Sequence, residues 1–425
     1  MAFRIERLYA QFLKYRSIST DTRNLIPHAI FFALKGDRFN ANAFAASALE
    51  QGCALAVVDD PKVAVDKRYI LVDDVTQCLQ DLAAYHRKQL NIPVIGITGS
   101  NGKTTTKELV NAVLSTQYRT HATQGNLNNH IGVPLTILST PKKTEILIVE
   151  MGANHAGEIG ELCEISQPDF GLVTSLGLAH LEGFGTFETI VKTKTALYRS
   201  VKKNKGLVFV SNQFDELMHR SRNQKRLTYG AEHAHFTADL VDDGVFVSLK
   251  FKSQTIHTQL TGEYNFNNIL AACAVGDYFE ISPKNIKKSL EQYTPSNNRS
   301  QLIKTNHNTL ILDAYNANPT SMGAALESFA KLDAGKKFFV LGDMLELGTE
   351  SLVEHQRIFS ILQKLKLHQG IFVGDIFQSL ALENSITFGD ADKAREFLRE
   401  QRFEDYTILI KGSRGIRLET IIDVL

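Results

Sequence analysis

The sequence of 425 residues predicts an α/β protein with three domains, at residues 1–88, 89–296 and 297–425. Three observations predict this class. Short apolar runs rich in β-branched residues alternate with amphipathic stretches along the chain, which is typical of strand–helix units with parallel sheets. Polar segments follow several of these runs, where the carboxyl edge of such a sheet would lie. The length suffices for about three domains of ordinary size.

The first domain is expected to be a small α/β unit with strands at 31–34, 54–58 and 70–72 and a helix at 43–51. Two polar clusters flank the first strand; they are Asp21, Thr22 and Arg23 before it and Lys35 and Gly36 after it. Turn and capping chemistry explains such clusters. An anion site for a nucleotide-linked substrate would explain them equally well, and the residues alone leave both interpretations open.

The central domain opens on the stretch around which the rest of the chain is organised. An apolar run at 92–97 and a glycine-containing turn lead into a helix that starts at Lys103. This arrangement directs backbone N–H groups and a helix N-terminus at an anion. Lys103 would reach the β- and γ-phosphates of a nucleotide, and the Thr104 hydroxyl would hold Mg²⁺. Ile97 replaces the usual glycine five residues before Gly102, so the loop is a variant. An ordinary turn is the alternative, but Gly-Lys-Thr-Thr after a buried strand favours a nucleoside triphosphate site.

Two more polar residues follow predicted strands of this domain. Glu150 comes directly after the apolar run 146–149, and a carboxylate there is placed to meet the Mg²⁺ of a nucleotide. A helix cap or a surface salt bridge is the alternative for such a residue. His180 follows the strand expected at 170–174, and a packed or hydrogen-bonded histidine is as good an interpretation as a functional one.

The remainder of the domain is expected to contain an amide-rich loop at 125–134, a helix at 187–200, strands between 207 and 260 that complete or flank the sheet, and a helix at 269–278. Lys192 and Lys194 on the first of these helices are by default solvated surface charges. The asparagines that precede 269–278 could cap that helix or bind a base edge. The polar stretch 283–295 is expected to be a linker.

The third domain alternates strands with helices and predicts a doubly wound, mostly parallel sheet. Strands are expected at 309–312, 338–341, 370–373 and 407–410, and helices near 320–332, 351–366, 390–401 and 416–424. Polar segments follow three of the strands, at 313–319, 342–344 and 411–415. They would line one edge of the sheet, where a ligand would sit.

Composition excludes several classes of function. The formal net charge of +1 offers no general attraction for nucleic acid or for an anionic membrane. The N-terminal segment has no continuous apolar core of a signal peptide, and no apolar run reaches the length of a membrane span. The cysteines show no paired spacing and are interpreted as free thiols in a reducing cytosol; they are Cys53, Cys78, Cys163 and Cys273.

Seven motifs occur in an order that resembles the Mur ligases, the ATP-dependent amide ligases that build the peptidoglycan stem peptide. They are TGSNGKTTTKE, GNLNNHIGVP, EMGANHAGEI, AHLEGFG, DAYNANPTSM, LGDMLELG and KGSRGIRLE. The likeness covers almost the whole chain and accounts for the variant loop. DAYNANP and LGDMLELG resemble the branch that adds D-alanyl-D-alanine. One departure is Tyr264-Asn265, where the family often has His-Asn; Asn268 still fits.

The resemblance implies a UDP-substrate domain, a central P-loop ATP-binding domain, and a Rossmann-like C-terminal domain that binds the incoming dipeptide. It implies catalytic roles for Lys103, Glu150, His180 and Lys194, and metal binding by Thr104, Glu150, His180 and, if carbamylated, Lys194. It implies ATP contacts from Gly99, Ser100, Asn101, Gly102, Lys103, Thr104, Thr105, Asn268, Arg299 and Asp313. Substrate contacts would come from Asp21, Thr22, Arg23, Lys35, Gly36, Asn126, Asn128, Asn129, Tyr315, Asn316, Asn318, Lys411, Ser413 and Arg414.

The implied reaction joins D-alanyl-D-alanine to a UDP-linked tripeptide through an acyl phosphate, with two Mg²⁺ ions, in a cytoplasmic monomer. A sibling ligase that adds one amino acid and a folylpolyglutamate synthase share the central domain, but the third-domain motifs argue against both. A regulatory P-loop ATPase would show nucleotide-dependent partner binding without substrate-dependent phosphate release, and a scaffold would give Lys103, Glu150 and His180 no joint purpose. The third residue of the tripeptide stays open.

Overall fold

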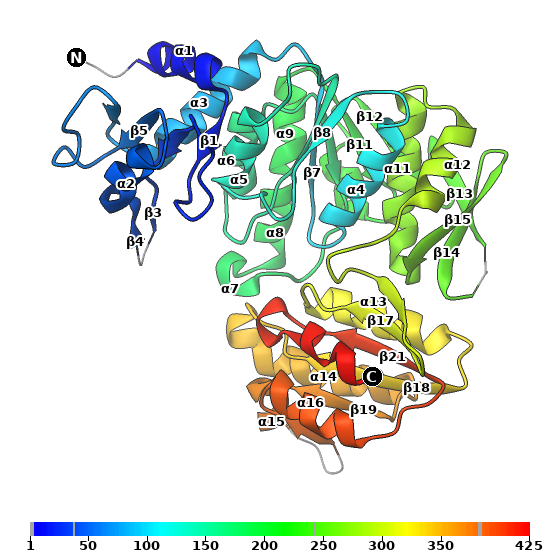
Figure 1. The fold of residues 1–425 in the computed structure, drawn as a ribbon. Helices are drawn as coiled ribbons and strands as arrows, with labels where there is room; N and C mark the ends of the chain where they lie inside the picture. The colour runs from blue at the N-terminus through cyan, green and yellow to red at the C-terminus, as the bar shows by residue number, and fades with distance from the viewer. Residues whose placement is uncertain (1–3, 37–38, 242–243, 381–384) are drawn as a thin grey trace.

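Three large sheets and one short two-stranded sheet organise the chain in the computed structural model, which describes residues 4–36, 39–241, 244–380 and 385–425. Figure 1 shows the first domain in blue at one side of the central domain, with the third domain in yellow to red below it. The three-domain α/β fold predicted from the sequence is confirmed.

The first domain contains a four-stranded parallel sheet of order β1-β2-β5-β6. Its elements are α1 (Ile5–Tyr15), β1 (Ile18–Ser19), β2 (Ile30–Phe32), β3 (Lys35–Gly36), β4 (Phe39–Asn40), η1 (Ala41–Phe44), α2 (Ala45–Glu50), β5 (Leu55–Val58), β6 (Tyr69–Leu71) and α3 (Val75–Gln89). The expected strands are confirmed to within one or two residues at most ends. The expected helix at 43–51 is a 3-10 turn followed by α2.

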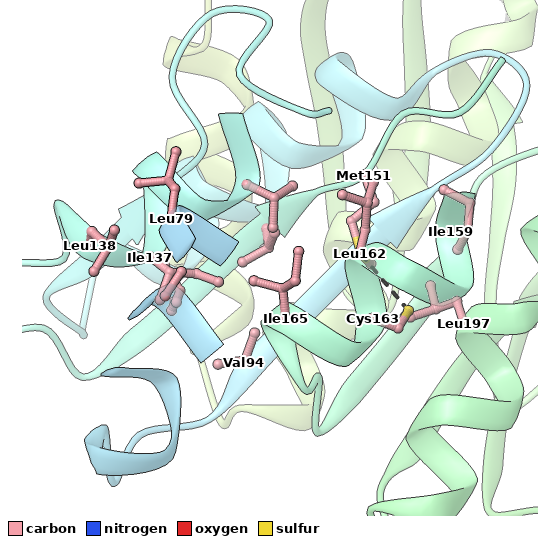
Figure 2. Packing of buried hydrophobic residues seen from close by; sticks show 14 of the residues in the cluster. Leu79, Val94, Ile137, Leu138, Met151, Ile159, Leu162, Cys163, Ile165 and Leu197 are labelled. Atoms are coloured by element: carbon pink, nitrogen blue, oxygen red, sulfur yellow. Dashed lines mark hydrogen bonds between the residues drawn. The ribbon is translucent and has the colours of Figure 1, made fainter. Parts of the chain in front are cut away.

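Helix α3 joins the first domain to the central one, and sequence analysis did not anticipate it. Asp74 caps it by accepting a hydrogen bond from the Gln77 N–H at 2.7 Å. Its apolar face packs against α5 (Gly132–Leu138) and α6 (Glu158–Ser166) of the central domain. Figure 2 shows Leu79 of α3 in this shared core, near Ile137 and Leu138 of α5. One continuous apolar core therefore runs from the first domain into the second.

The four cysteines are free and buried, as predicted. Cys163 of α6 lies with its Sγ 3.9 Å from the Met151 Sδ in the same core (Figure 2). Burial raises the pKa of the Cys163 thiol to about 12, so the thiol stays protonated and behaves as a small apolar group. No disulfide chemistry is therefore expected from these residues.

His86 on α3 makes the stability of the first domain sensitive to acid. Its side chain is 3% exposed, and burial lowers its pKa from 6.5 to about 4. Between these two values the unfolded chain binds a proton that the folded chain does not, so the free energy of unfolding falls as the pH decreases. We expect a loss of about 3 kcal/mol from pH 7 to pH 4 relative to His86→Phe, whose ring can pack beside Phe12. Urea denaturation of the wild type and of His86→Phe across this pH range measures the free energy of unfolding of each. If the free energy of unfolding changes with pH in parallel in the two proteins, the prediction is wrong.

The central domain is built on a nine-stranded sheet of order β15-β14-β13-β12-β11-β10-β7-β9-β8. The strands from β8 to β13 pair in parallel, and β14 and β15 add an antiparallel edge. The strands are β7 (Val94–Thr98), β8 (Thr120–Ala122), β9 (Ile146–Glu150), β10 (Phe170–Val173), β11 (Leu207–Ser211), β12 (Arg226–Gly230), β13 (Phe236–Val241), β14 (Phe246–Phe251) and β15 (Gln254–Thr261). The strands expected between 207 and 260 thus complete the sheet, as predicted.

Helices cover both faces of this sheet. Besides α5 and α6 they are α4 (Lys103–Leu114), α7 (Leu181–Phe184), α8 (Phe187–Lys194), α9 (Ala196–Lys203), α10 (Asp215–Arg220), η2 (Glu263–Asn265), α11 (Phe266–Tyr278) and α12 (Pro283–Gln292). The single helix expected at 187–200 is divided at Thr195 into α8 and α9. The small-residue helix expected at 269–278 is α11, which packs on α4.

The prediction of a linker at 283–295 is wrong for most of its length, because α12 occupies residues 283–292. Ser282 caps this helix, and Pro283 lies in its first turn, where the missing N–H does no harm. Ile286 and Leu290 are fully buried against the central core. Their spacing of four residues places both on one helix face. The polar residues between them make the stretch look like a linker in the sequence.

The third domain has a six-stranded sheet of order β16-β17-β21-β18-β19-β20, parallel except for β16. Its elements are β16 (Gln301–Lys304), β17 (Thr309–Asp313), α13 (Pro319–Lys331), β18 (Lys336–Gly342), η3 (Gly348–Glu350), α14 (Ser351–Lys364), β19 (Gly370–Val373), α15 (Asp375–Ser379), β20 (Ile386–Phe388), α16 (Ala391–Glu400), β21 (Tyr406–Lys411), η4 (Arg414–Ile416) and η5 (Leu418–Val424). The four expected strands and three of the four expected helices are confirmed. The fourth helix, expected at 416–424, is the 3-10 helix η5.

Candidate active site

A cavity of about 920 Å³ lies between the central and third domains. Strands β10, β7 and β9 are parallel neighbours, so the loops after them open on the same edge of the central sheet. The loop after β17 and Lys411 at the end of β21 line the opposite wall. Of the predicted site residues, the cavity is lined by Ser100, Asn101, Gly102, Lys103, Thr104, Thr105, Asn126, Asn128, Asn129, Glu150, His180, Asn268, Arg299, Asp313, Tyr315, Asn316, Asn318 and Lys411. The sequence-predicted groups of two domains therefore meet at one site.

The loop between β7 and α4 is held by the residues that follow β10. The Ser100 N–H donates to the Ser175 carbonyl at 3.0 Å, and the Asn101 N–H donates to the Ser175 hydroxyl at 2.9 Å. A Cβ at Gly99 would lie 1.9 Å from the Thr174 hydroxyl, so only glycine allows this approach. The first N–H groups of α4 have no partner within the helix and face the cavity side of this loop. The geometry suits an anion bound at a helix N-terminus.

Lys103 begins α4 and supplies the positive charge of the loop. Its Nζ donates to the Gly99 carbonyl at 2.8 Å and to the Ser100 carbonyl at 3.2 Å. Removal of the ammonium from water lowers its pKa to about 8, the Glu150 carboxylate opposes that shift, and the charge of Arg299 adds to it. The Lys103 ammonium therefore remains mostly charged at neutral pH, and its hydrogen bonds to two carbonyls do not neutralise that charge. It is thus suited to bind an anionic ligand.

Glu150 at the end of β9 lies beside the loop. The Thr104 hydroxyl donates to its Oε1 at 3.1 Å, and the Asn128 amide donates to the same oxygen at 2.7 Å. Glu150 is 1% exposed, and its Oε2 has no hydrogen-bond partner among the residues that the structure describes. An unpartnered oxygen of a buried carboxylate next to a threonine hydroxyl is a donor set that suits Mg²⁺, so the residues fit this ion. No cluster of three or more His, Cys, Asp or Glu suited to a metal occurs in the described part of the chain. Phosphate oxygens and water would complete the coordination.

His180 lies after β10, at the start of α7, and faces the third domain. Its Nδ1 is 2.6 Å from Oε2 of Glu346, which comes from the loop after β18. The His180 ring beside it holds the pKa of the Glu346 carboxyl below its usual value. Sequence analysis named His180 but missed Glu346, whose motif was used only as a family marker.

Lys194 is not a surface residue, contrary to the default interpretation of its helix position. It is fully buried at the end of α8, and its Nζ has no hydrogen-bond partner within the described residues. The Nζ lies 5.5 Å from the centre of the Phe184 ring. Burial holds the pKa of this amine well below its usual value, and the charge of Lys103 adds to that effect. Lys192, by contrast, is exposed.

Asn268 on α11 approaches the loop from the other side. A Cβ at Gly102, whose φ is +79°, would lie 2.4 Å from the Asn268 amide oxygen. That oxygen accepts a hydrogen bond from Thr106 at 3.1 Å, and the amide nitrogen donates to Asn265 at 2.8 Å. Asn265 and Asn268 thus join the start of α11 to α4 beside the phosphate loop, and Asn268 also lines the cavity.

The opposite wall carries charged groups of the third domain besides Glu346. Asp313 and Lys411 are register partners on β17 and β21, and the Lys411 Nζ is 2.5 Å from the Asp313 Oδ2. The Arg299 guanidinium stacks 3.5 Å from the centre of the Tyr315 ring, and Arg414 lies 5.4 Å from the same centre. Arg414 itself is exposed, outside the cavity lining.

Asn318 has structural contacts as well as a place in the lining. It caps α13 through the Ser321 N–H at 2.9 Å, and its amide donates to Asn101 of the phosphate loop at 2.7 Å. The Leu178 N–H donates to the Thr320 hydroxyl at 3.1 Å close by. These contacts join the two domains directly at the phosphate loop.

Several predicted substrate residues lie elsewhere. In the first domain Asp21 pairs with Arg23, and Lys35 pairs with Asp59 at 2.8 Å, away from this cavity. Thr22 and Gly36 are also outside its lining. Ser413 is buried, accepts a hydrogen bond from the Leu345 N–H at 2.9 Å, and does not line the cavity either.

None of the helices in the described parts of the chain has the length and apolar character required to cross a bilayer.

Comparisons with known proteins agree with the geometry. The family model of the Mur ligase middle domain matches residues 97–276, and that of the Mur ligase glutamate ligase domain matches residues 298–414. UDP-N-acetylmuramoyl-tripeptide–D-alanyl-D-alanine ligase of Bacillus subtilis is 36% identical, over 95% of this chain and 92% of that protein. The crystal structure of MurF from Acinetobacter baumannii aligns with a TM-score of 0.87 at 33% identity, over 96% of this chain and 93% of that one. MurF of Thermotoga maritima in complex with ADP aligns with a TM-score of 0.86 at 26% identity, over 97% of each chain. The chain therefore belongs to the Mur ligase family.

Proposed function

We propose that this chain joins D-alanyl-D-alanine to a UDP-N-acetylmuramoyl-tripeptide at the expense of ATP, in the last cytoplasmic step of peptidoglycan precursor synthesis. The observation that carries this proposal is the meeting of Lys103, Glu150 and His180 with the third-domain wall in one cavity. The relatives that match over nearly the full length bear the name of this ligase, and one of their structures was solved with ADP.

The chemistry requires activation of a carboxylate, because joining it to an amine is uphill in water. The tripeptide carboxylate oxygen attacks the γ-phosphorus of ATP, the bond to the β-phosphate oxygen breaks, and ADP leaves. The dipeptide amine then attacks the acyl carbon of the acyl phosphate, and inorganic phosphate leaves with formation of the amide. Lys103 would stabilise the charge that spreads over the transferred phosphoryl group. Closure of the two domains around the cavity would exclude water that would otherwise hydrolyse the acyl phosphate.

Metal ions form a further part of the proposal. Thr104 and Glu150 would hold one Mg²⁺, and His180 with a carbamylated Lys194 would hold a second. When bound, such ions offset the repulsion between the triphosphate and the acceptor carboxylate. An ammonium at Lys194 would repel a cation, whereas a carbamate would attract it.

We also propose the domain limits 1–88, 89–296 and 297–425. The first domain would bind the UDP moiety, the second would bind ATP, and the third would bind the dipeptide. Asp21, Thr22, Arg23, Lys35 and Gly36 would contact the UDP moiety. The chain would act as a cytoplasmic monomer.

A phosphate-release assay over a matrix of UDP-linked peptides and amine acceptors tests the proposed reaction. Release should require ATP, a UDP-linked tripeptide and D-alanyl-D-alanine together, and mass spectrometry should find the pentapeptide product. The tripeptides should include diaminopimelate and lysine forms, since the third residue is open. Release with single amino acids in place of the dipeptide, or release without any acceptor, would refute the proposal.

Asn316 offers a test of the dipeptide site. It follows β17 on the third-domain wall, across the cavity from the phosphate loop. Asn316→Ala is expected to raise the KM for D-alanyl-D-alanine by about tenfold, the effect of one lost hydrogen bond in a binding site. The KM for ATP should change less than about twofold. Steady-state kinetics with each substrate varied in turn measures both KM values. Equal increases in the two KM values would contradict the assignment of Asn316 to the dipeptide site.

A further inference from the structure

The loop after β18, residues 342–348, is fixed in place along its backbone. Both Asp343 carboxylate oxygens accept hydrogen bonds at 2.9 Å from the first N–H groups of α15. The Met344 N–H donates to the His355 Nε2 at 3.0 Å, and the Leu345 N–H donates to the Ser413 hydroxyl. Leu347 is buried in the third-domain core. The loop is thus a rigid support, and of its residues only Glu346 lines the cavity.

Glu346 reaches across the domain boundary to His180. Its Oε2 is 2.6 Å from the His180 Nδ1, and its backbone carbonyl accepts a hydrogen bond from the Glu182 N–H at 3.2 Å. Both residues of the pair have left-handed backbones, with φ of 53° at His180 and 64° at Glu346. Such a conformation is unfavourable for a residue with a side chain, and it persists where the surrounding contacts impose it. Strained residues on both sides of one contact indicate that the contact itself is required.

We infer that Glu346 is a positioning residue for His180, supplied by the third domain when it closes on the central one. The Glu346 carboxylate occupies the Nδ1 side of the ring, which leaves Nε2 as the ring atom available to bind an ion. The Glu346 side chain is 53% exposed, and an ion pair so exposed adds little to stability. Its role is therefore to orient the ring, and through it to couple domain closure to assembly of the site. This inference rests on the proposed function for its effect on turnover.

Three variants of the full-length chain test the pair. Glu346→Ala removes the acceptor, and Glu346→Gln keeps an oxygen in place without the charge. Glu350→Gln is the matched control. Glu350 lies four residues after Glu346, its carboxylate is exposed, and its side chain does not cap α14. The readouts are the ¹⁵N shifts of the His180 ring, assigned by comparison with His180→Asn, and steady-state turnover with ATP, tripeptide and dipeptide.

Glu346→Ala is expected to shift the His180 ring signals, because the carboxylate 2.6 Å from Nδ1 is lost. Turnover of Glu346→Ala should fall about 10- to 100-fold, the usual effect of removing the partner of a functional histidine. Glu346→Gln should retain at least about fivefold more turnover than Glu346→Ala, because an acceptor remains. Affinity for ADP should change less than about twofold in each variant, since the phosphate loop is untouched. Glu350→Gln should match the wild type throughout.

An unchanged His180 spectrum in Glu346→Ala, or turnover equal to that of Glu350→Gln, would overturn the inference. The ring shifts are recorded without any substrate, so they judge the contact independently of the reaction. If Glu346→Ala shifts the His180 ring signals but the wild-type chain releases no phosphate with the tripeptide and dipeptide, the proposed function is refuted and the contact is established.

Discussion

Lys103→Ala is expected to abolish ATP turnover, with kcat reduced about 10³-fold or more. The lysine begins α4, at the point where the loop N–H groups and the helix N-terminus converge, and its ammonium is the charge of the phosphate loop itself. Its pKa of about 8 shows that burial already disfavours the charged form, so an anionic ligand would stabilise it. The charge would act most strongly in the transition state, where negative charge spreads over the γ-phosphoryl oxygens.

The measurement is substrate-dependent phosphate release together with ADP binding. Lys192→Ala is the control, because Lys192 lies in the same domain but is exposed and outside the cavity. Thermal unfolding should show that Lys103→Ala remains folded, since Nζ bonds only to two carbonyls of its own loop. Turnover near the wild-type rate in a folded Lys103→Ala protein would mean that the loop does not act in catalysis.

The parts of the fold that could be predicted are those dictated by local pattern. Strand β7 is a continuous β-branched run that becomes a fully buried central strand, and the Gly-Lys-Thr-Thr sequence after it fixes the start of α4. Motifs at strand ends could be placed together because parallel strands share a carboxyl edge. That rule places Glu150 at the nucleotide site, whereas only the family resemblance assigns His180 to the same site; both residues line the cavity.

The parts that escaped prediction depend on contacts between distant segments. Helix α12 was taken for a linker because its apolar residues are few, and only the core they enter shows them to be a helix face. The burial of Lys194 could not be predicted from its helix alone, because the same helix also carries the exposed Lys192. Glu346 was missed because its partner lies 166 residues away in another domain, and no local pattern in LGDMLELG indicates a contact with a histidine.

The site is therefore a product of domain contact as much as of the central sheet. The contacts that join the third domain to the edge of the central one include hydrogen bonds from Asn318 to Asn101 and from Leu178 to Thr320, and the pair formed by His180 and Glu346. They surround the loops that would hold the triphosphate and the acceptor carboxylate. Closure would thus bring the dipeptide side to the activated carboxylate and shield it from water at the same step.

Lys194→Ala is expected to lower kcat by about 100-fold and to recover part of that loss with added formate or acetate. Burial without a hydrogen-bond partner lowers the pKa of this amine and so favours its neutral form, which is the form that attacks the carbon of CO₂. Loss of one proton then leaves a carbamate, whose negative charge the Lys103 ammonium would attract. Removing the side chain would open space in which a small carboxylate can take the place of the carbamate.

Lys194→Met separates this role from a purely structural one. A buried amine without a hydrogen-bond partner opposes folding, so an apolar side chain of similar length should leave the thermal midpoint unchanged or raise it. The methionine variant should be as inactive as the alanine variant, yet it should not respond to formate because its side chain fills the space. Lys192→Ala should keep full activity with or without carboxylate. A fully active Lys194→Ala protein, or a loss of activity matched by a lower thermal midpoint in both variants, would rule out the carbamate.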